Sequence, residues 1–190
     1  MSVVDSRIWG PNVWYFIHQV AYAFIRENRS IPEKEKRLLK SCMTYLKPLM
    51  PCPSCRAHYA RTLSRFPVER ESRNGRDIFN WSVRAHNLAN KGLKKKVLTY
   101  TQAKNIHKGP IQYNKLEKFI DVILIQSKNK ALSTRRSMAV CVVNLFPCTK
   151  CRSNMLRYQR NNKLKKISTN SDMTKWARGL MRVFRRSRPK

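Results

Sequence analysis

The sequence is poor in glycine, in acidic residues and in long apolar stretches, and these shortages exclude several classes of protein. Five glycines in 190 residues disfavour Gly-rich nucleotide loops and long flexible linkers. No stretch approaches the roughly 20 apolar residues of a membrane span. The N-terminal segment MSVVDSRIWGPN lacks the apolar core of a secretory signal, which predicts synthesis in the cytosol. No segment alternates with period two, which argues against a sheet.

The shortage of acidic residues leaves a large positive charge. Ten acidic residues stand against 41 basic ones, which gives a formal net charge of +31. Residues 1–96 carry +12 and residues 97–190 carry +19. A field of this size attracts polyanions, so nucleic acid or an acidic capsid surface is the expected partner of the second half. A solvated basic surface without a dedicated partner is the alternative.

Apolar periodicity predicts an all-α fold with a packed core. Helices are expected over residues 11–27, 33–49, 54–64 and 77–93. Pro11 suits the first position of the first helix. The polar residues 69–76 are expected to form a loop, with Asn74-Gly75 as its turn.

The chain contains an internal repeat. Residues 49–56 read LMPCPSCR and residues 145–152 read LFPCTKCR. Each motif is followed by an aspartate and, four residues later, a tryptophan: Asp77 and Trp81, then Asp172 and Trp176. We interpret this register as a degenerate duplication that joins near Gly109-Pro110. It divides the chain into residues 1–108 and residues 109–190.

The first copy contains a candidate redox pair, Cys52 and Cys55. Two cysteines separated by two residues at the start of a helix can close a small redox disulfide. The helix N-terminus, Arg56 and His58 all favour a thiolate there. Zinc ligation, or two reduced cysteines in a core, are the alternatives.

Two helices of the first half carry candidate ligand-binding residues. Trp14 and His18 share one helix face, although a core aromatic and a buried histidine give the same pattern. His86, Asn87 and Asn90 cluster on an otherwise apolar helix, where unpaired polar groups are costly to bury. Such a cluster suits a flat ligand that forms hydrogen bonds.

These motifs, in this order, resemble those of the Erv/ALR family of FAD-linked sulfhydryl oxidases. The matching elements are Trp9-Gly10-x3-Trp14-x3-His18, Pro51-Cys52-x2-Cys55-Arg56 and Trp81-x4-His86-Asn87-x2-Asn90-x4-Lys95. The resemblance covers about residues 7–107 and is strongest to the compact versions of large DNA viruses. It implies a four-helix bundle with a short fifth helix, followed here by the degenerate helical repeat.

The resemblance also implies an enzyme, a FAD-dependent thiol oxidase. The residues that would contact the cofactor are Gly10, Trp14, His18, Trp81, His86, Asn87 and Asn90, with Lys95 near the phosphates. Cys55 would lie against the flavin ring and Cys52 would face the substrate. Electrons from a dithiol protein would pass through Cys52–Cys55 to FAD and then to O2, producing H2O2.

The second half departs from this pattern. Met181 and Arg182 occupy the positions of His86 and Asn87, and there is no Trp-x3-His helix, so a second FAD site is not expected. The pair Cys148 and Cys151 is either a relay or a structural remnant. The preceding apolar run MAVCVVNLF favours a fixed, structural pair, whereas the basic residues around the motif favour a thiolate.

Two cysteines have no evident role in the sequence. Cys42 and Cys141 each lack a neighbour with which to pair, and the structural disulfide of many cellular family members has no obvious counterpart.

Two other functions compete with the oxidase. One is a basic virion structural or nucleic-acid-associated protein that retains the oxidase fold, which would be colourless when purified. The other is zinc binding by Cys52, Cys55, Cys148 and Cys151, whose pairs lie 93 residues apart, far from compact zinc-site spacing. We therefore expect no metal site. If the chain is viral, the host cytoplasm or the virion is its expected location, and the sequence is compatible with an oligomer.

Overall fold

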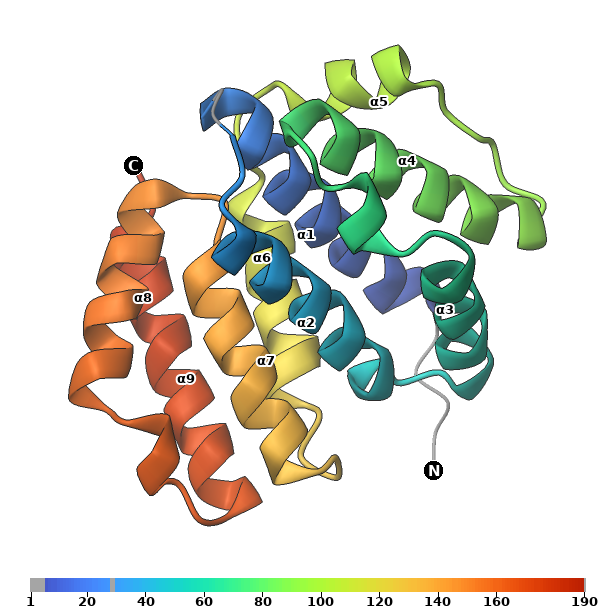
Figure 1. Ribbon diagram of the computed structural model, residues 1–190. Coiled ribbons are helices and arrows are strands. Elements are labelled where there is room, and N and C mark those ends of the chain that lie inside the picture. Colours follow the sequence, from blue (N-terminus) through green and yellow to red (C-terminus); the bar gives the residue numbers. More distant parts are fainter. Residues whose placement is uncertain (1–5, 28–29, 190) are drawn as a thin grey trace.

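The computed structural model describes residues 6–27 and 30–189, and this part of the chain is helical without strands, as predicted (Figure 1). The first half contains α1 (Ser6–Glu27), α2 (Glu33–Leu49), α3 (Pro53–Arg65), the 3-10 segment η1 (Val68–Glu71), α4 (Gly75–Gly92) and α5 (Tyr100–His107). The second half contains α6 (Tyr113–Ile120), the π-helical segment η2 (Asp121–Ile125), α7 (Leu132–Leu145), α8 (Thr149–Asn161), the 3-10 segment η3 (Leu164–Lys166) and α9 (Asn170–Ser187). Helices α1 to α4 form the expected four-helix arrangement, and α5 packs on α1 and α4.

The predicted helix limits are close to the observed ones except at the start of α1. That helix begins at Ser6 rather than at residue 11, so Pro11 lies in its second turn and not at its first position. Pro11 has no N–H, so one helical hydrogen bond is lost at this position. Because Pro11 is exposed, the loss occurs at the surface of the molecule. No helix within the described ranges combines the length and apolar content needed to cross a membrane.

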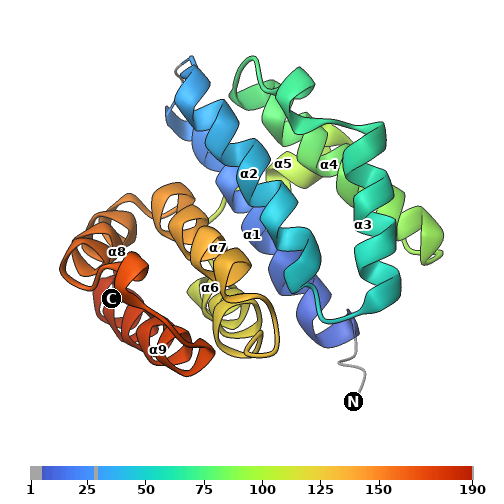
Figure 2. The same cartoon turned by 60° about the horizontal axis from the view of Figure 1, so that its bottom comes forward.

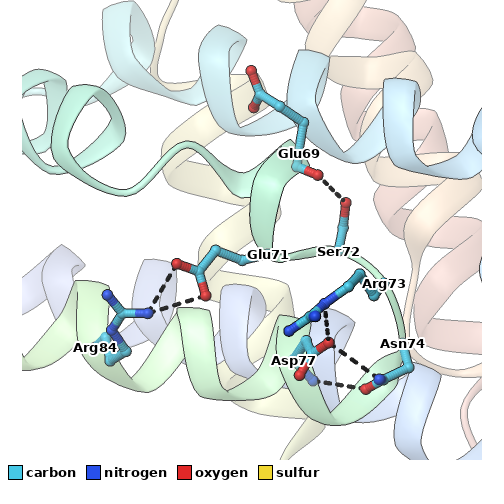
Figure 3. A network of polar contacts seen from close by, with 7 residues as sticks. All are labelled: Glu69, Glu71, Ser72, Arg73, Asn74, Asp77 and Arg84. Atoms are coloured by element: carbon cyan, nitrogen blue, oxygen red, sulfur yellow. Dashed lines mark hydrogen bonds and ion pairs between the residues drawn. The ribbon is translucent and has the colours of Figure 1, made fainter.

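Several of the few acidic residues fix the connection between α3 and α4 (Figure 3). Asn74 caps α4 by accepting a hydrogen bond from the Asp77 N–H at 2.9 Å. The Arg84 guanidinium binds both carboxylate oxygens of Glu71, at 2.9 and 3.0 Å. The predicted polar loop is therefore a braced turn that sets where α4 begins.

The repeated sequence register corresponds to repeated local geometry. The Trp81 indole N–H donates to the Phe66 carbonyl at 2.8 Å, and the Trp176 indole N–H donates to the Asn162 carbonyl at 2.7 Å. Both acceptors lie 14 residues after the first cysteine of their motif. Thr169 caps α9 as Asn74 caps α4. These contacts support the interpretation of a duplication.

The two halves pack helix against corresponding helix. In the alignment of the repeats, α6 corresponds to α1 and α7 to α2, and the structure packs α6 on α1 and α7 on α2. The Phe16 and Phe119 rings stack with centroids 3.8 Å apart. One continuous apolar core crosses the join between α5 and α6. The division at residue 108 therefore stays an interpretation, because the halves share their core.

A disulfide between Cys42 on α2 and Cys141 on α7 joins the halves, with Cα atoms 5.4 Å apart. Neither cysteine has a neighbour in the sequence with which to pair, and the structure shows that they pair with each other. Cys42 precedes its motif by 10 residues and Cys141 by 7, so the repeat register did not pair them. The two separations differ by three residues, which is about one helical turn. A shift of one turn keeps a side chain on the same face of its helix, so both cysteines lie on the faces along which α2 and α7 pack.

Candidate functional site

The first Cys-x-x-Cys motif lies where α2 ends and α3 begins. Pro51 lies in the connection, and Pro53 occupies the first turn of α3, where a missing N–H costs nothing. Cys52 is the N-cap of α3, and its sulfur accepts a hydrogen bond from the Cys55 N–H at 3.2 Å. The two cysteines form a disulfide. The positive end of the helix therefore points at the sulfur atoms, which favours a thiolate when the bond is reduced.

A cavity of about 420 Å³ opens between α1, α3 and α4. This volume falls in the usual range of small-molecule sites, about 300–1,000 Å³. It is lined by Trp9, Gly10, Pro11, Val13, Trp14, Met50, Ser54, Cys55, His58, Tyr59, Arg61, His86, Ala89, Asn90, Gly92, Leu93 and Lys95. All of these residues belong to the first half. Cys55 lines the cavity, whereas Cys52 does not.

Five of the eight predicted cofactor residues line this cavity: Gly10, Trp14, His86, Asn90 and Lys95. The Trp14 and His86 rings stack with centroids 4.4 Å apart and an interplanar angle of 6°. Lys95 supplies positive charge at the solvent-exposed end of the site, and Arg61 is a second exposed cation in the lining. The arrangement combines flat rings with cations, which suits a ligand with an aromatic ring system and phosphates.

The other three predicted residues lie outside the cavity lining. The Asn87 side chain forms two hydrogen bonds with the Leu98 backbone, at 2.7 and 3.0 Å, and so braces the segment between α4 and α5. Trp81 is buried and anchors the C-terminal end of α3 through Phe66. His18 contacts the lining residue His86. Direct cofactor contact by His18, Trp81 and Asn87 stays a prediction.

Hydrogen bonding fixes the direction in which His86 presents its ring. Ser82 donates its hydroxyl proton to the Phe79 carbonyl, so its oxygen accepts from His18 Nδ1–H at 2.9 Å. His18 Nε2 then accepts from His86 Nδ1–H, also at 2.9 Å. Nε2 of His86 remains as an acceptor.

Burial keeps this histidine cluster neutral. It lowers the pKa of His18 well below its ordinary value, and it lowers the pKa of His86 and of His107 to about 4. Neighbouring positive charge acts in the same direction, from Lys95 on His86 and from Lys115 on His107. His107 lies at the end of α5 and accepts from the Gln19 amide at 3.3 Å.

Two lining residues were not predicted to bind the cofactor: Trp9, which belongs to the first motif, and His58, which lies just after the second. Trp9 Nε1 and His58 Nε2 are buried, and neither has a hydrogen-bond partner within the described part of the chain. Buried polar atoms without partners are uncommon because they are costly, so both nitrogens indicate a missing ligand. His58 lies three residues after Cys55 and therefore shares its helix face, which was the available signal.

Comparison with known proteins identifies the chain. Residues 11–108 match the family described as Erv1 / Alr. The chain belongs to the Erv1/Alr family. This membership confirms the resemblance and the all-helical fold that were expected from the motifs, and the family match ends near the end of α5.

The individual relatives are viral proteins. A protein of Acanthamoeba polyphaga mimivirus, named "Probable FAD-linked sulfhydryl oxidase", is 30% identical over 96 residues, which cover 50% of this chain and 65% of that protein. Two FAD-linked sulfhydryl oxidases of African swine fever virus are 29% and 28% identical, and the aligned regions cover 91% and 82% of their lengths. Against this chain, those two regions cover 57% and 54%. No solved structure gave a significant match.

The second Cys-x-x-Cys motif has the same local geometry in a closed setting. Cys148 is the N-cap of α8, its sulfur accepts from the Cys151 N–H at 3.2 Å, and the two form a disulfide. The first cysteines are similarly buried, with Cys148 6% and Cys52 8% exposed, but Cys151 is fully buried whereas Cys55 is partly exposed. The Arg26 guanidinium donates to the Pro147 carbonyl at 3.4 Å. All six cysteines are thus in disulfides, so the four thiolates of the zinc interpretation are not present in this structure.

Proposed function

We propose that this chain is a FAD-dependent thiol oxidase that forms disulfides in protein substrates through Cys52–Cys55. The observation that carries the proposal is the asymmetry of the pair. Cys55 lines the cavity, and Cys52 caps the helix beside it without lining the cavity. This placement supports Cys55 as the cysteine next to the cofactor and Cys52 as the cysteine that meets the substrate. The function agrees with the names of the viral relatives.

The cavity fits the cofactor that the family implies. Trp14 and His86 offer stacked rings. The nitrogens that have no partner within the described residues add polar contacts: Trp9 Nε1–H can donate one hydrogen bond, and His58 Nε2 can donate or accept one. Lys95 and Arg61 would hold the phosphates at the exposed end. Bound FAD would accept two electrons from the reduced cysteine pair and pass them to O2, giving H2O2.

The residues of the chain perform the thiol chemistry in two exchanges. A substrate thiolate attacks the Cys52 sulfur, which breaks the Cys52–Cys55 bond and releases the Cys55 thiolate. The second substrate thiolate attacks the mixed disulfide, which completes the substrate disulfide and releases the Cys52 thiolate. The N-terminus of α3 stabilises the Cys52 thiolate, because the Cys55 N–H points at its sulfur.

The proposal is tested on the purified chain. It should bind FAD, absorb as a flavoprotein and consume O2 when given a dithiol, with H2O2 produced in equal amount. The alternative of a basic structural protein that retains the fold is not supported by the comparisons, since the relatives are named as oxidases. Folded protein that does not take up FAD would contradict the oxidase.

For the second pair we propose a structural role. Cys148 and Cys151 are buried at the contact with α1, and the Arg152–Glu27 ion pair at 3.1 Å closes the site further. A relay must reach Cys52 from outside, which requires exposure or movement of this pair. The Cys148→Ser/Cys151→Ser variant should therefore oxidise small dithiols and protein dithiols at wild-type rates. Selective loss of the protein-substrate rate would establish the relay.

For the basic second half we propose duplex nucleic acid as the partner. The outward faces of α8 and α9 carry exposed cations at helical spacing: Lys150, Arg157, Arg160, Lys175, Arg178, Arg182 and Arg186. Of these, Lys175 has a nearby carboxylate, Asp172 at 3.7 Å. A regular row of cations suits a phosphate backbone and predicts weak, sequence-independent binding that falls steeply with salt.

Substitution tests this surface better than truncation. Phe184 and Leu180 on α9 are fully buried, so deleting the end of the chain would remove core residues as well as charge. The variant Arg178→Gln/Arg182→Gln/Arg186→Gln should reduce the slope of log affinity against log salt by about 3. An unchanged slope would place the binding surface elsewhere.

Because the relatives are viral and this surface is basic, we propose that the chain is a viral protein that acts in the host cytoplasm or is packaged in the virion.

A further inference from the structure

The arginine that follows each Cys-x-x-Cys motif has a different partner in the two halves. Arg152 forms an ion pair with Glu27 of the other half at 3.1 Å. Arg56 instead donates to the carbonyls of Met50 and Pro51, at 2.8 and 3.4 Å. Among the described residues, no carboxylate lies within ion-pair distance of Arg56. The cation next to the active disulfide therefore lacks the counterion that its counterpart has.

The second half places another cation at the same end of the molecule. Helices α2 and α7 run antiparallel and are joined by Cys42–Cys141, so the start of α7 lies beside the end of α2 (Figures 1 and 2). The chain leaves α2 through Met50 and Pro51 to reach Cys52. Lys130 precedes Ala131, the N-cap of α7, and therefore approaches this connection from the second half.

The position of Lys130 is fixed by its backbone. Its N–H donates to the Ser127 carbonyl at 2.9 Å, and its carbonyl accepts from the Asn170 amide at 3.2 Å. Partial burial, and next to it the nearby positive charge of Arg56, lower the pKa of Lys130. Two neighbouring like charges repel each other, and an anion that bound both would remove this repulsion. The described part of the chain supplies no carboxylate to Lys130.

We propose that Arg56 and Lys130 form a cationic rim beside Cys52 that selects dithiol segments carrying carboxylates next to their cysteines. The inference rests on the proposed thiol oxidase function and adds the class of its substrate. An acidic segment would supply the missing counterion as its thiolate reaches Cys52. Charges at a rim act mainly on the rate of encounter and on the choice of partner, and their effect weakens with salt.

The test uses the full-length, FAD-loaded chain and dithiol peptides that differ in one respect. The peptides keep one cysteine spacing and are flanked by glutamates, glutamines or lysines. The measured quantity is kcat/KM from O2 consumption at low and at high salt. Wild type should prefer the acidic to the basic peptide by about three- to tenfold at low salt, the effect of one or two exposed ion pairs, and the preference should shrink at high salt.

Two substitutions locate the effect. Lys130→Gln should narrow the ratio between acidic and basic peptides, and Lys130→Glu should invert it. Lys163→Glu is the matched control, because it changes the net charge equally at an exposed lysine after α8 and should leave the ratio at its wild-type value. Flavin absorbance and helical circular dichroism check that each variant is folded.

The outcomes separate the two proposals. Oxidation of the neutral peptide with no difference between acidic and basic peptides would overturn the cationic rim and leave the oxidase intact. A ratio that Lys163→Glu changes as much as Lys130→Glu would also overturn it, since net charge alone would then explain the preference. Failure to oxidise any peptide would instead overturn the proposed function. If Lys130→Glu does not fold, the salt dependence of the wild-type preference and the ratio measured for Lys130→Gln still test the cationic rim.

Discussion

The two Cys-x-x-Cys motifs share a local structure and differ in what surrounds them. In both, the first cysteine caps a helix and accepts from the N–H of the second at 3.2 Å. The first motif borders a cavity with unpartnered polar nitrogens. The second is covered by the end of α1, where Glu27 pairs with Arg152 and Arg26 donates to the Pro147 carbonyl. The motif therefore sets the disulfide, whereas the neighbouring helices determine whether it can meet a cofactor and a substrate.

The largest difference should appear when one cysteine of each pair is removed. Cys55→Ser should abolish dithiol oxidation, because no second thiolate remains to pass electrons to FAD, while FAD stays bound. Cys151→Ser at the corresponding position should keep near wild-type activity with some loss of stability. O2 consumption and flavin absorbance measure both. Wild-type turnover by Cys55→Ser would refute the electron path.

The bond between the halves should have the next largest effect. Cys42→Ser removes a cross-link that spans 99 residues, which chain-entropy arguments value at about 4–5 kcal/mol. Thermal unfolding with and without reductant measures the loss. Reductant should lower the melting temperature of wild type more than that of Cys42→Ser. Equal sensitivity would show that the two motif disulfides account for the stabilisation.

Acid should destabilise the first half, which contains all four histidines of the sequence. The pKa values of His86 and His107 are lowered to about 4 in the folded state, against about 6.5 unfolded. The unfolded chain therefore binds more protons between pH 6.5 and 4, so stability is complete above that range and is lost as the pH falls through it.

A shift of that size corresponds to about 3 kcal/mol per histidine. His107→Asn should remove part of the acid dependence, which denaturant titrations at several pH values measure. The sequence of residues 109–190 contains no histidine, so no titration of this kind is expected from the second half. An unfolding free energy that is constant between pH 7 and pH 4.5 would show that folding does not lower the pKa values of these histidines.

A smaller effect is expected from the unpartnered nitrogen of His58. His58→Phe keeps a ring but removes the polar atom, so the FAD dissociation constant should rise about three- to tenfold. The FAD-free protein should not become less stable, since an unsatisfied buried atom has been removed. Gln159→Met is the control, because its Oε1 is also buried without a partner within the described chain but lies in the second half. FAD affinity unchanged by His58→Phe would remove His58 from the binding set.

The smallest effect should come from the ion pair that seals the second motif. Arg152→Gln breaks the contact with Glu27, and a partly exposed ion pair of this kind contributes about 1 kcal/mol. Thermal unfolding and the rate of reduction of Cys148–Cys151 by a small thiol measure the result. Faster reduction with little loss of stability would show that Arg152 acts as a cover. A relay-like gain in protein-dithiol oxidation would contradict the structural role.

Helix positions were predictable from sequence because they depend on local periodicity and on Pro, Gly and Asn signals. The helix over residues 33–49 was placed at its observed limits. The turn expected at Asn74-Gly75 is instead the start of α4, with Asn74 as its N-cap and Gly75 as its first residue. The start of α1 was missed because Pro11 resembles a helix start and its surface position tolerates the lost hydrogen bond.

The site was predictable only where motif residues also face the cavity. Trp14 and His86 line it, but Asn87 turns to the Leu98 backbone, and no local signal distinguishes Asn87 from Asn90. The Cys42–Cys141 bond was missed because it depends on how two helices 99 residues apart pack. Such contacts follow from tertiary geometry that spacing along the chain does not encode.

The Cys42–Cys141 bond closes a covalent ring of polypeptide. The ring contains α3, α4, α5 and α6. The segments outside it, at either end of the chain, contain α1, α8 and α9. Lys108, Gly109 and Pro110 are the exposed connection between the halves, and they belong to the ring. A protease that cuts there opens the ring into one branched molecule, whose two fragments separate on a denaturing gel only after reduction. The halves can therefore be nicked without being parted.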